Sequence, residues 1–239
     1  MAEEKEIKLL LSEEIDKVAL YAQLSSKLKL KNTVIQSDHY YDNETFLFTK
    51  QDKGLRIRFV NQTPIDFTFK ALFYFPNRKP SPWYVEEQTF KLPTQEIQLV
   101  QAIFERLNLT FSQKQNNELT YDDLHHLFAQ NQLQPKLIIE KKRKTFLYED
   151  AQIVWDEVKN LGTFIEIETK SSSPIRISEE LELLKFGTRT IEGYTTLLAR
   201  KLGLAEMKAK EPLYLENPLW NVFKQEKIIY EKLANQVAK

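Results

Sequence analysis

The sequence has no cysteine, and it has only five glycines and three histidines among 239 residues. Without cysteine, the chain can form no disulfide, no thiolate metal site and no cysteine nucleophile. No glycine lies in a GxGxxG, Walker A or GxSxG motif, so any phosphate must be bound by side chains and not by a glycine-rich loop. The histidines form neither an HExxH motif nor another zinc set.

The chain also lacks a long apolar run and an excess of charge of either sign. No segment approaches the ~18–20 apolar residues of a membrane-spanning helix, and the acidic start over residues 1–5 does not resemble a signal peptide. We therefore expect a protein of the cytoplasm with no membrane partner. Because 34 Lys and Arg residues balance 34 Asp and Glu residues, we do not expect a general nucleic-acid binder.

Alternating and helical patterns divide the chain, which is long enough for one large domain or one domain with an appendage. We predict eight strands over residues 4–11, 34–42, 55–60, 66–75, 83–90, 136–146, 151–158 and 163–170. We predict helices after Ser12, after Thr94, after Thr120, over residues 178–184 and 191–202, and in the tail. This order indicates an α+β fold in which antiparallel pairing dominates.

Like charges share one face of several predicted strands. Because alternate residues of a strand share a face, Arg56 lies beside Arg58 and Glu166 beside Glu168, with apolar residues on the other face. Such a face can be the solvent side of an ordinary antiparallel sheet. Neighbouring like charges cost energy, however, unless an opposite charge lies between them. Carboxylate pairs suit Mg²⁺ or Mn²⁺ and arginine pairs suit phosphate, so the pattern favours a metal-bound polyanion.

Short motifs in a fixed order carry a family resemblance. They are EKEIK at 4–8, DHYYD at 38–42, GLRIR at 54–58, TFK at 68–70, KKR at 141–143, VWDEV at 154–158, LGTFIEIE at 161–168 and GYTTLL at 193–198. The first matches an ExExK signature, which alone would be a weak signal. Together, over residues 4–203, the motifs resemble the CYTH domain, also called the triphosphate tunnel metalloenzyme superfamily.

The resemblance implies a fold and a division of the chain. The fold it implies is a closed eight-stranded antiparallel β-barrel, a tunnel that binds a triphosphate, with helices packed outside. The tunnel domain is expected over residues 1–204, and a helical extension over residues 205–239 is expected to pack on or beside it. The oligomeric state is left open between a monomer and a homodimer.

The resemblance also implies roles for individual residues, with carboxylates holding Mg²⁺ or Mn²⁺ and basic side chains holding phosphate. The implied metal ligands are Glu4, Glu6, Glu86, Glu166 and Glu168. The implied triphosphate-binding residues are Lys8, Arg56, Arg58, Lys70 and Arg143. The residues expected to act in catalysis are Glu6, Asp156 and Glu168, with Asp156 as a further metal ligand or a group that orients water.

Two of these assignments depend on which side of a strand faces the tunnel. Lys142 and Arg143 are adjacent and must point to opposite faces, and we expect Arg143 to point inward. Glu86 and Glu87 cannot both point inward, and we place Glu86 inside together with Tyr84. Because the family has a basic residue two positions before this glutamate, one phosphate contact is expected to be absent here.

The implied activity is metal-dependent hydrolysis of a phosphoanhydride bond in a small triphosphate. The substrate could be inorganic tripolyphosphate, thiamine triphosphate or a nucleoside triphosphate, and the tail at 210–215 loosely resembles the extension of thiamine triphosphatases. An alternative within the family is a class IV-type adenylyl cyclase, which makes cyclic AMP and pyrophosphate from ATP. A further alternative is a nucleotide- or polyphosphate-binding module without turnover. The carboxylate set argues against that module, because a phosphate receptor gains little from extra negative charge.

Overall fold

The computed structural model describes residues 5–74, 83–112, 117–190 and 192–203. The chain divides into two compact units, Met1–Ala205 and Glu206–Lys239, and the described residues all belong to the first. The helical extension expected over residues 205–239 lies outside the described residues, as does Glu4. The division of the chain at residue 204 therefore stays a prediction.

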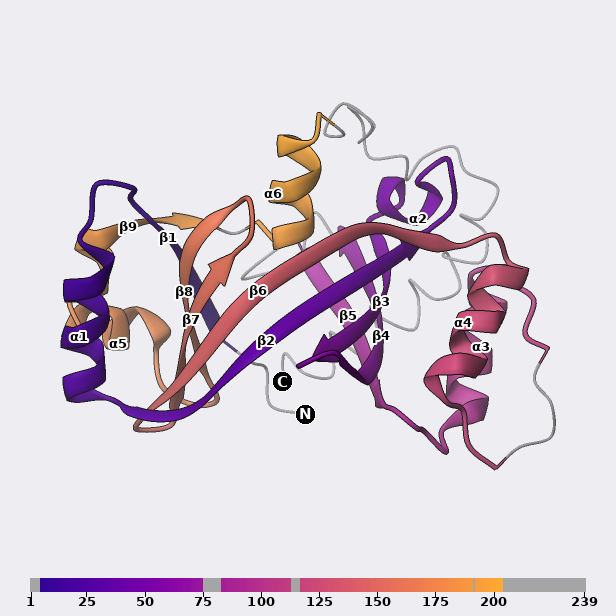
Figure 1. Ribbon diagram of the computed structural model, residues 1–239, viewed down its shortest axis with the longest axis horizontal. Helices are drawn as coiled ribbons and strands as arrows, with labels where there is room; N and C mark the ends of the chain where they lie inside the picture. Colours follow the sequence, from indigo (N-terminus) through magenta and orange to yellow (C-terminus); the bar gives the residue numbers. More distant parts are fainter. Residues whose placement is uncertain (1–4, 75–82, 113–116, 191, 204–239) are drawn as a thin grey trace. The chain divides into compact units, whose positions relative to one another are not determined.

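One antiparallel sheet of nine strands forms most of the described structure (Figure 1). In spatial order, its strands are β5 (Trp83–Lys91), β4 (Thr63–Tyr74), β3 (Lys53–Val60), β2 (Lys29–Asp42), β6 (Gln134–Tyr148), β7 (Ala151–Val158), β8 (Gly162–Thr169), β1 (Lys5–Leu11) and β9 (Gly187–Thr190). The long strands β2 and β6 pair in the middle of this order and run side by side in Figure 1. The prediction of an α+β fold with a large antiparallel sheet is confirmed.

The sheet differs from the expected eight-stranded closed barrel. β5 and β9 are its two edge strands, and the described residues form no pair that joins these edges. The unexpected ninth strand, β9, pairs with β1 over Lys8–Leu11 and so occupies part of the edge that β5 would need for closure. Gly187 permits this approach, because a Cβ atom there would lie 2.4 Å from the carbonyl oxygen of Leu10.

Six α-helices and a 3₁₀ turn connect the strands in the described residues. They are α1 (Lys17–Lys27), α2 (Leu47–Lys50), α3 (Ile97–Arg106), α4 (Tyr121–Gln130), α5 (Pro174–Glu180), the 3₁₀ turn η1 (Leu183–Phe186) and α6 (Tyr194–Lys201). The predicted start of α4 is confirmed, since Thr120 and Asp123 form a reciprocal capping box. No helix in the described part of the chain is long and apolar enough to cross a membrane.

Four predicted helix starts were wrong, including that of α6, which begins at Tyr194, three residues after the predicted start. α1 begins after Asp16 and not after Ser12, because the Asp16 carboxylate accepts hydrogen bonds from the free amides of Val18 and Ala19. α3 begins after Glu96, since Thr94 forms a β-bridge with Leu119 and its hydroxyl accepts a hydrogen bond from the amide of Glu96, which precedes the helix. α5 begins at Pro174, four residues before the predicted start at residue 178. The segment at 171–174 therefore starts a helix and does not only break the chain.

Helices cover the apolar face of the sheet in two groups. α3 and α4 contribute Phe104 and Phe128 to a core with Phe67 and Phe69 of β4 and other residues of β3 and β5. α1 and α5 pack on β1, β7 and β8, where Leu24 belongs to a second core. We call this side of the sheet the helix face. α6 differs from these helices, because its apolar residues pack on the opposite side, which carries the candidate site.

Candidate active site

Strand register gathers charged side chains on one side of the sheet, which we call the polar face. Arg143 lies opposite Asp156, Arg58 opposite both Asp38 and Asp66, Lys8 opposite Glu166, and Glu6 opposite Glu168. Because every second residue of a strand shares a face, these pairs belong to one continuous surface. Its charged members are Glu6, Lys8, Asp38, Arg56, Arg58, Asp66, Lys70, Glu87, Lys91, Lys141, Arg143, Asp156, Glu166 and Glu168.

Arg143 stands at the centre of one half of the polar face. Its guanidinium donates two hydrogen bonds to the fully buried Asp156, from Nε to Oδ1 at 2.8 Å and from Nη2 to Oδ2 at 2.5 Å. Nη2 also donates to Oε2 of Glu166 at 2.7 Å, and Lys8 Nζ lies 3.1 Å from Oε1 of that glutamate. Burial disfavours the charge of Glu166, but Lys8 and Arg143 outweigh it and lower the pKa of this carboxyl to about 2.

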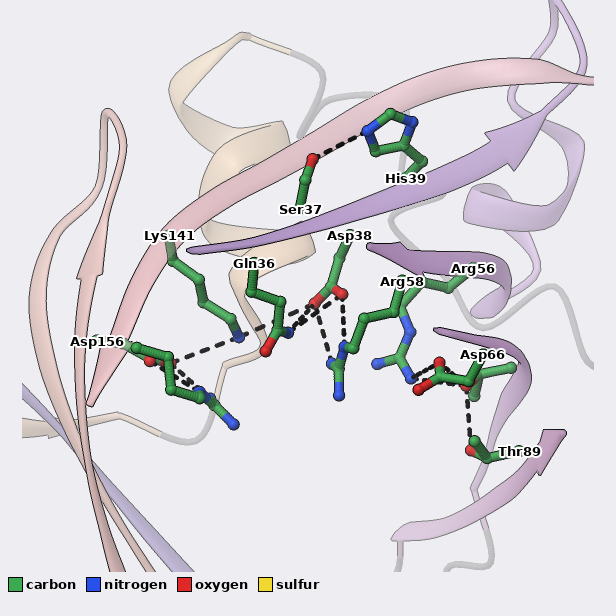
Figure 2. Close-up of polar contacts among 12 residues, drawn as sticks. Gln36, Ser37, Asp38, His39, Arg56, Arg58, Asp66, Thr89, Lys141 and Asp156 are labelled. Carbon is green, nitrogen blue, oxygen red and sulfur yellow. Dashed lines mark hydrogen bonds and ion pairs between the residues drawn. The ribbon is translucent and has the colours of Figure 1, made fainter. Parts of the chain in front are cut away.

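Two arginines of β3 stand in the other half of the polar face (Figure 2). Arg58 donates two hydrogen bonds to Asp38, from Nε to Oδ1 at 2.7 Å and from Nη2 to Oδ2 at 3.0 Å. Arg56 Nη2 donates to Thr68 Oγ1 at 2.6 Å and to Asp66 Oδ1 at 3.3 Å. Burial disfavours the charge of Asp38, yet its hydrogen bonds from Arg58 hold its pKa below the ordinary value. Asp38 thus stays ionised, and its two hydrogen bonds fix the plane of the Arg58 guanidinium.

Lys141 joins the two halves and was missed by the sequence analysis. Its Nζ lies 3.4 Å from Asp156 and 3.9 Å from Asp38, as the dashed lines in Figure 2 show. Burial and the neighbouring guanidinium of Arg143 lower the pKa of Lys141. A signal was present in the sequence, because Lys141 precedes Arg143 by two residues on a strand and must share its face. Lys142 lies on the opposite, helix-covered side of β6 and is exposed.

α6 adds one more polar group to this cluster. The hydroxyl of Tyr194 donates to Oδ2 of Asp156 at 3.1 Å. Burial raises the pKa of this hydroxyl, and the carboxylates of Glu166 and Asp156 raise it further, so it stays protonated and acts as a donor. Asp156 therefore accepts hydrogen bonds from Arg143 and Tyr194 and pairs with Lys141. This carboxylate anchors cations, which differs from the expected role as a metal ligand or water-orienting group.

The expected metal ligands do not converge as a set in the described residues. Among the residues that the structure describes, no group of three or more His, Cys, Asp or Glu side chains could hold a metal ion. Glu4 lies outside these residues, and Glu166 is engaged by Lys8 and Arg143. Glu6 and Glu168 do lie directly opposite each other on β1 and β8, and the Glu6 side chain is 45% exposed.

These two carboxylates fit a hard divalent cation. Lys8 Nζ lies 3.4 Å from Oε1 of Glu6, and the two opposed carboxylates still offer neighbouring oxygens to a further cation. Carboxylate oxygens are the ligands that Mg²⁺ and Mn²⁺ prefer. Glu6 and Glu168 therefore form the acidic end of the polar face, next to the basic cluster around Lys8.

The prediction that Glu86 is a metal ligand needs correction, because Glu86 lies on the helix face of β5 and not on the polar face. Its Oε1 accepts a hydrogen bond at 2.8 Å from Nη1 of Arg106, which belongs to α3 on the helix face. Glu87 points to the polar face instead and pairs with Lys70 at 3.2 Å, with both side chains largely exposed. The two neighbouring glutamates could not be distinguished by sequence, and the packing of α3 on β5 decides between them.

Comparison with known proteins gives the family. The family model described as CYTH domain matches residues 2–191. The chain belongs to the CYTH domain family. The structure of PH1819 from Pyrococcus horikoshii OT3 resembles this CYTH chain with a TM-score of 0.55 and 21% identity, over 83% of this chain and 99% of that chain. No curated protein sequence matches the chain.

A second similar structure carries a description of activity. HpAC1 from Hippeastrum, described as an adenylyl cyclase with a dominant triphosphatase activity, has a TM-score of 0.50 and 18% identity. The match covers 84% of this CYTH chain and 96% of HpAC1. At these identities, the two likenesses concern the fold. They show that these two proteins share the fold of this chain.

The polar face of this CYTH chain is suited to a polyanion. Each of its central cations forms an ion pair with a carboxylate of a β-strand. These pairs already restrict the cationic side chains, so ligand binding costs little further conformational entropy. Guanidinium groups such as those of Arg58 and Arg143 present paired donors that match phosphate oxygens as well as carboxylates. The arrangement can therefore exchange carboxylate contacts for phosphate contacts along the sheet.

Proposed function

We propose that the protein is a divalent-metal-dependent hydrolase that cleaves a phosphoanhydride bond in a small triphosphate. The observation that carries this proposal is the row of partly or fully buried cations across the polar face. The row consists of Lys8, Arg143, Lys141, Arg58 and Arg56, which come from three strands. Ion pairs connect the first four of these residues in one network, and Arg56 pairs with Asp66 beside it. A linear triphosphate carries several negative charges in a row and is the ligand that such an arrangement matches.

The basic side chains perform the binding step. Arg143 and Arg58 would each donate two parallel hydrogen bonds to phosphate oxygens, as they now do to Asp156 and Asp38. Lys141 lies between them and would neutralise the central phosphate as a point charge. Fixed charges of this kind stabilise the charge that develops on the leaving phosphate during phosphoryl transfer.

The acidic end of the polar face would hold the metal and handle the proton. Glu6 and Glu168, together with Glu4, would hold Mg²⁺ or Mn²⁺, which would neutralise phosphate charge and lower the pKa of bound water when present. A carboxylate of this end that is partly exposed, such as Glu6, can accept a proton from an attacking water. Enclosure of the substrate in a closed tunnel stays a prediction.

Product analysis tests the proposal directly. The full chain is incubated with Mg²⁺ or Mn²⁺ and, separately, with tripolyphosphate, thiamine triphosphate and ATP, and the products are identified. We expect release of orthophosphate. Cyclic AMP with pyrophosphate would instead indicate a cyclase, and tight binding without products would indicate a binding module.

A pair of variants tests the acidic end. Glu168→Gln should lower kcat by about 100-fold or more with little change in the unfolding midpoint, because it removes charge needed in the reaction. Glu157→Gln is the matched control, since Glu157 lies on the other side of β7 beside Lys144 and should retain full turnover. Normal turnover of a folded Glu168→Gln protein would defeat the metal assignment.

A further inference from the structure

α6 is distinctive because it covers part of the face that carries the candidate site. Leu198 and Ala199 of α6 pack against Leu137, Ile139 and Phe164, which lie on the polar face toward one end of β6 and β8. The acidic pair Glu6 and Glu168 lies toward the other end of β1 and β8. α6 therefore forms an apolar cap at the end of the polar face that is remote from the proposed metal ligands.

Tyr194, at the start of α6, reaches from this cap into the charged row. Its ring centroid lies 4.7 Å from Nζ of Lys8 and 4.8 Å from Nζ of Lys141, and its hydroxyl donates to Asp156. The ring also meets Phe164 edge to face, with centroids 4.9 Å apart. Two strands, β7 and β8, separate the strands that carry the two lysines. A single aromatic side chain is thus a shared contact of both ammonium groups.

These contacts offset two costs of placing two lysine side chains close together. Lys8 and Lys141 repel each other as like charges, and each has a long side chain with many rotamers. The π-face of an aromatic ring attracts an ammonium group without neutralising it, so the lysine keeps its full charge for a ligand. A carboxylate in the same place would hold the lysines more strongly but would compete with phosphate.

We propose that Tyr194 is a positioning residue of the triphosphate site, whose ring holds the ammonium groups of Lys8 and Lys141 at the spacing that phosphate binding requires. The proposal rests on the proposed function for the identity of the ligand. It assigns the ring, and not the hydroxyl, as the group that matters. It also makes α6 part of the binding site, in addition to its role in covering the sheet.

Two substitutions at Tyr194 separate the ring from the hydroxyl. Tyr194→Leu removes the ring, and we expect the dissociation constant for tripolyphosphate and the KM to rise about 10-fold, with kcat changing less than 3-fold. Tyr194→Phe keeps the ring and should stay within about 3-fold of the wild type in each quantity. This split is the signature of positioning, because a general loss of structure would lower kcat as well.

Tyr21 offers a matched control on the helix face of the same sheet. Its ring lies 4.0 Å from Nζ of Lys144 and meets Trp155 edge to face with centroids 5.6 Å apart. Tyr21→Leu therefore removes the same kinds of contact from α1 and should lower the unfolding midpoint. It should leave the dissociation constant and the KM within 2-fold of the wild type.

The experiment uses the full chain and reads binding and turnover separately. Binding of tripolyphosphate is measured calorimetrically in metal-free buffer, and phosphate release is measured with Mg²⁺. The inference is overturned if Tyr194→Leu binds tripolyphosphate as tightly as the wild type, or if Tyr194→Phe is as impaired as Tyr194→Leu. If Tyr194→Leu does not fold, a loss of 10-fold or more in Tyr194→Phe binding overturns the inference, and binding within 3-fold supports it.

The wild-type arm reports on the proposed function independently. A wild type that binds tripolyphosphate without releasing phosphate defeats the proposed hydrolysis, and the ratio of the variant and wild-type dissociation constants still decides the role of Tyr194. A wild type that does not bind tripolyphosphate overturns both.

Discussion

Two partly buried arginines of this protein have almost the same exposure and lie on opposite faces of one sheet. The side chain of Arg143 is 17% exposed and pairs with Glu166 and Asp156, whereas that of Arg106 is 16% exposed and pairs with Glu86. Arg106 comes from α3, and its guanidinium carbon lies 5.2 Å from the ring centroid of Phe69, so it packs between a helix and the sheet. Arg143 belongs to a row of cations that several strands supply.

The comparison shows that burial and pairing of a charge do not by themselves mark a binding site. Both glutamates, Glu166 and Glu86, are buried and held by a guanidinium, and both were expected to bind metal. What distinguishes the polar face is that ion pairs from several strands are linked to one another. Lys141 links Asp156 to Asp38, and thereby links ion pairs of β6 and β7 to those of β2 and β3. Four predictions, in order of expected effect, test this distinction.

The largest effect is expected when a buried anion is removed from either face. Asp156→Ala removes the carboxylate that Arg143 and Lys141 share, and Glu86→Ala removes a carboxylate that pairs with Arg106. We expect each to lower the free energy of unfolding by about 3 kcal/mol, because a largely buried cation loses an anionic partner. Urea denaturation measures this loss. Asp156→Ala should also change the dissociation constant for tripolyphosphate, because Asp156 both positions Arg143 and Lys141 and competes with phosphate for them. An equal change in folded Glu86→Ala would contradict the distinction between the faces.

Acid should weaken the polar face through Glu166. The pKa of this carboxyl is about 2 in the folded protein and 4.5 ordinarily, so its contribution is fully present above about pH 4.5 and is lost as the pH falls toward 2. The shift corresponds to about 3 kcal/mol. Urea unfolding between pH 2 and 6 should show this loss in the wild type, and Glu166→Gln should reduce the slope. An unchanged slope in Glu166→Gln would mean that Lys8 and Arg143 do not hold this carboxylate as described.

Arginine substitutions separate stability from activity. Arg143→Gln should lower kcat/KM for tripolyphosphate about 100-fold, since it removes a bidentate donor from the proposed site. Arg106→Gln should leave kcat/KM within about 3-fold, because Arg106 lies on the helix face. Initial-rate measurements with tripolyphosphate on both folded variants give the two values of kcat/KM to be compared. If Arg106→Gln lost as much activity as Arg143→Gln, the site would not be confined to the polar face.

The smallest effect is expected at the exposed end of the polar face. The Lys70 side chain is 54% exposed and pairs with Glu87, so Lys70→Ala should change the free energy of unfolding by less than about 1 kcal/mol. If Lys70 reaches the outer phosphate, its loss should raise the KM for tripolyphosphate about 5-fold. A KM unchanged by Lys70→Ala would limit the site to the buried cations.

Most of the sheet could be predicted because its strands alternate strongly between apolar and charged residues. The order of the eight expected strands is present in the structure, with β2 and β6 longer than predicted. β9 was missed because it has four residues, and its pairing depends on the edge of β1, which is 180 residues away in sequence. The start of α5 was missed because Ser173 and Pro174 resemble a break, although both favour a helix start.

The site could be predicted where a motif and strand alternation agree. Arg56, Arg58 and Arg143 lie on the polar face for this reason. Glu86 and Glu87 could not be separated, because adjacent residues of like charge satisfy the motif in either register. The contact of Glu86 with Arg106 depends on the packing of α3, which no local pattern shows. The same limitation applies to Tyr194, whose contacts arise only when α6 folds back onto the sheet.

The pairing of each central cation with a carboxylate has a kinetic consequence. Lys8, Arg56, Arg58, Lys141 and Arg143 each have an anionic neighbour, so the polar face presents little net positive field to the solvent. Electrostatic steering accelerates association when a surface carries a field of one sign. If the protein binds a triphosphate as proposed, the ligand meets a nearly neutral surface, and its association rate should depend little on ionic strength. Selectivity among polyanions would then arise after contact, when phosphate oxygens replace the carboxylates.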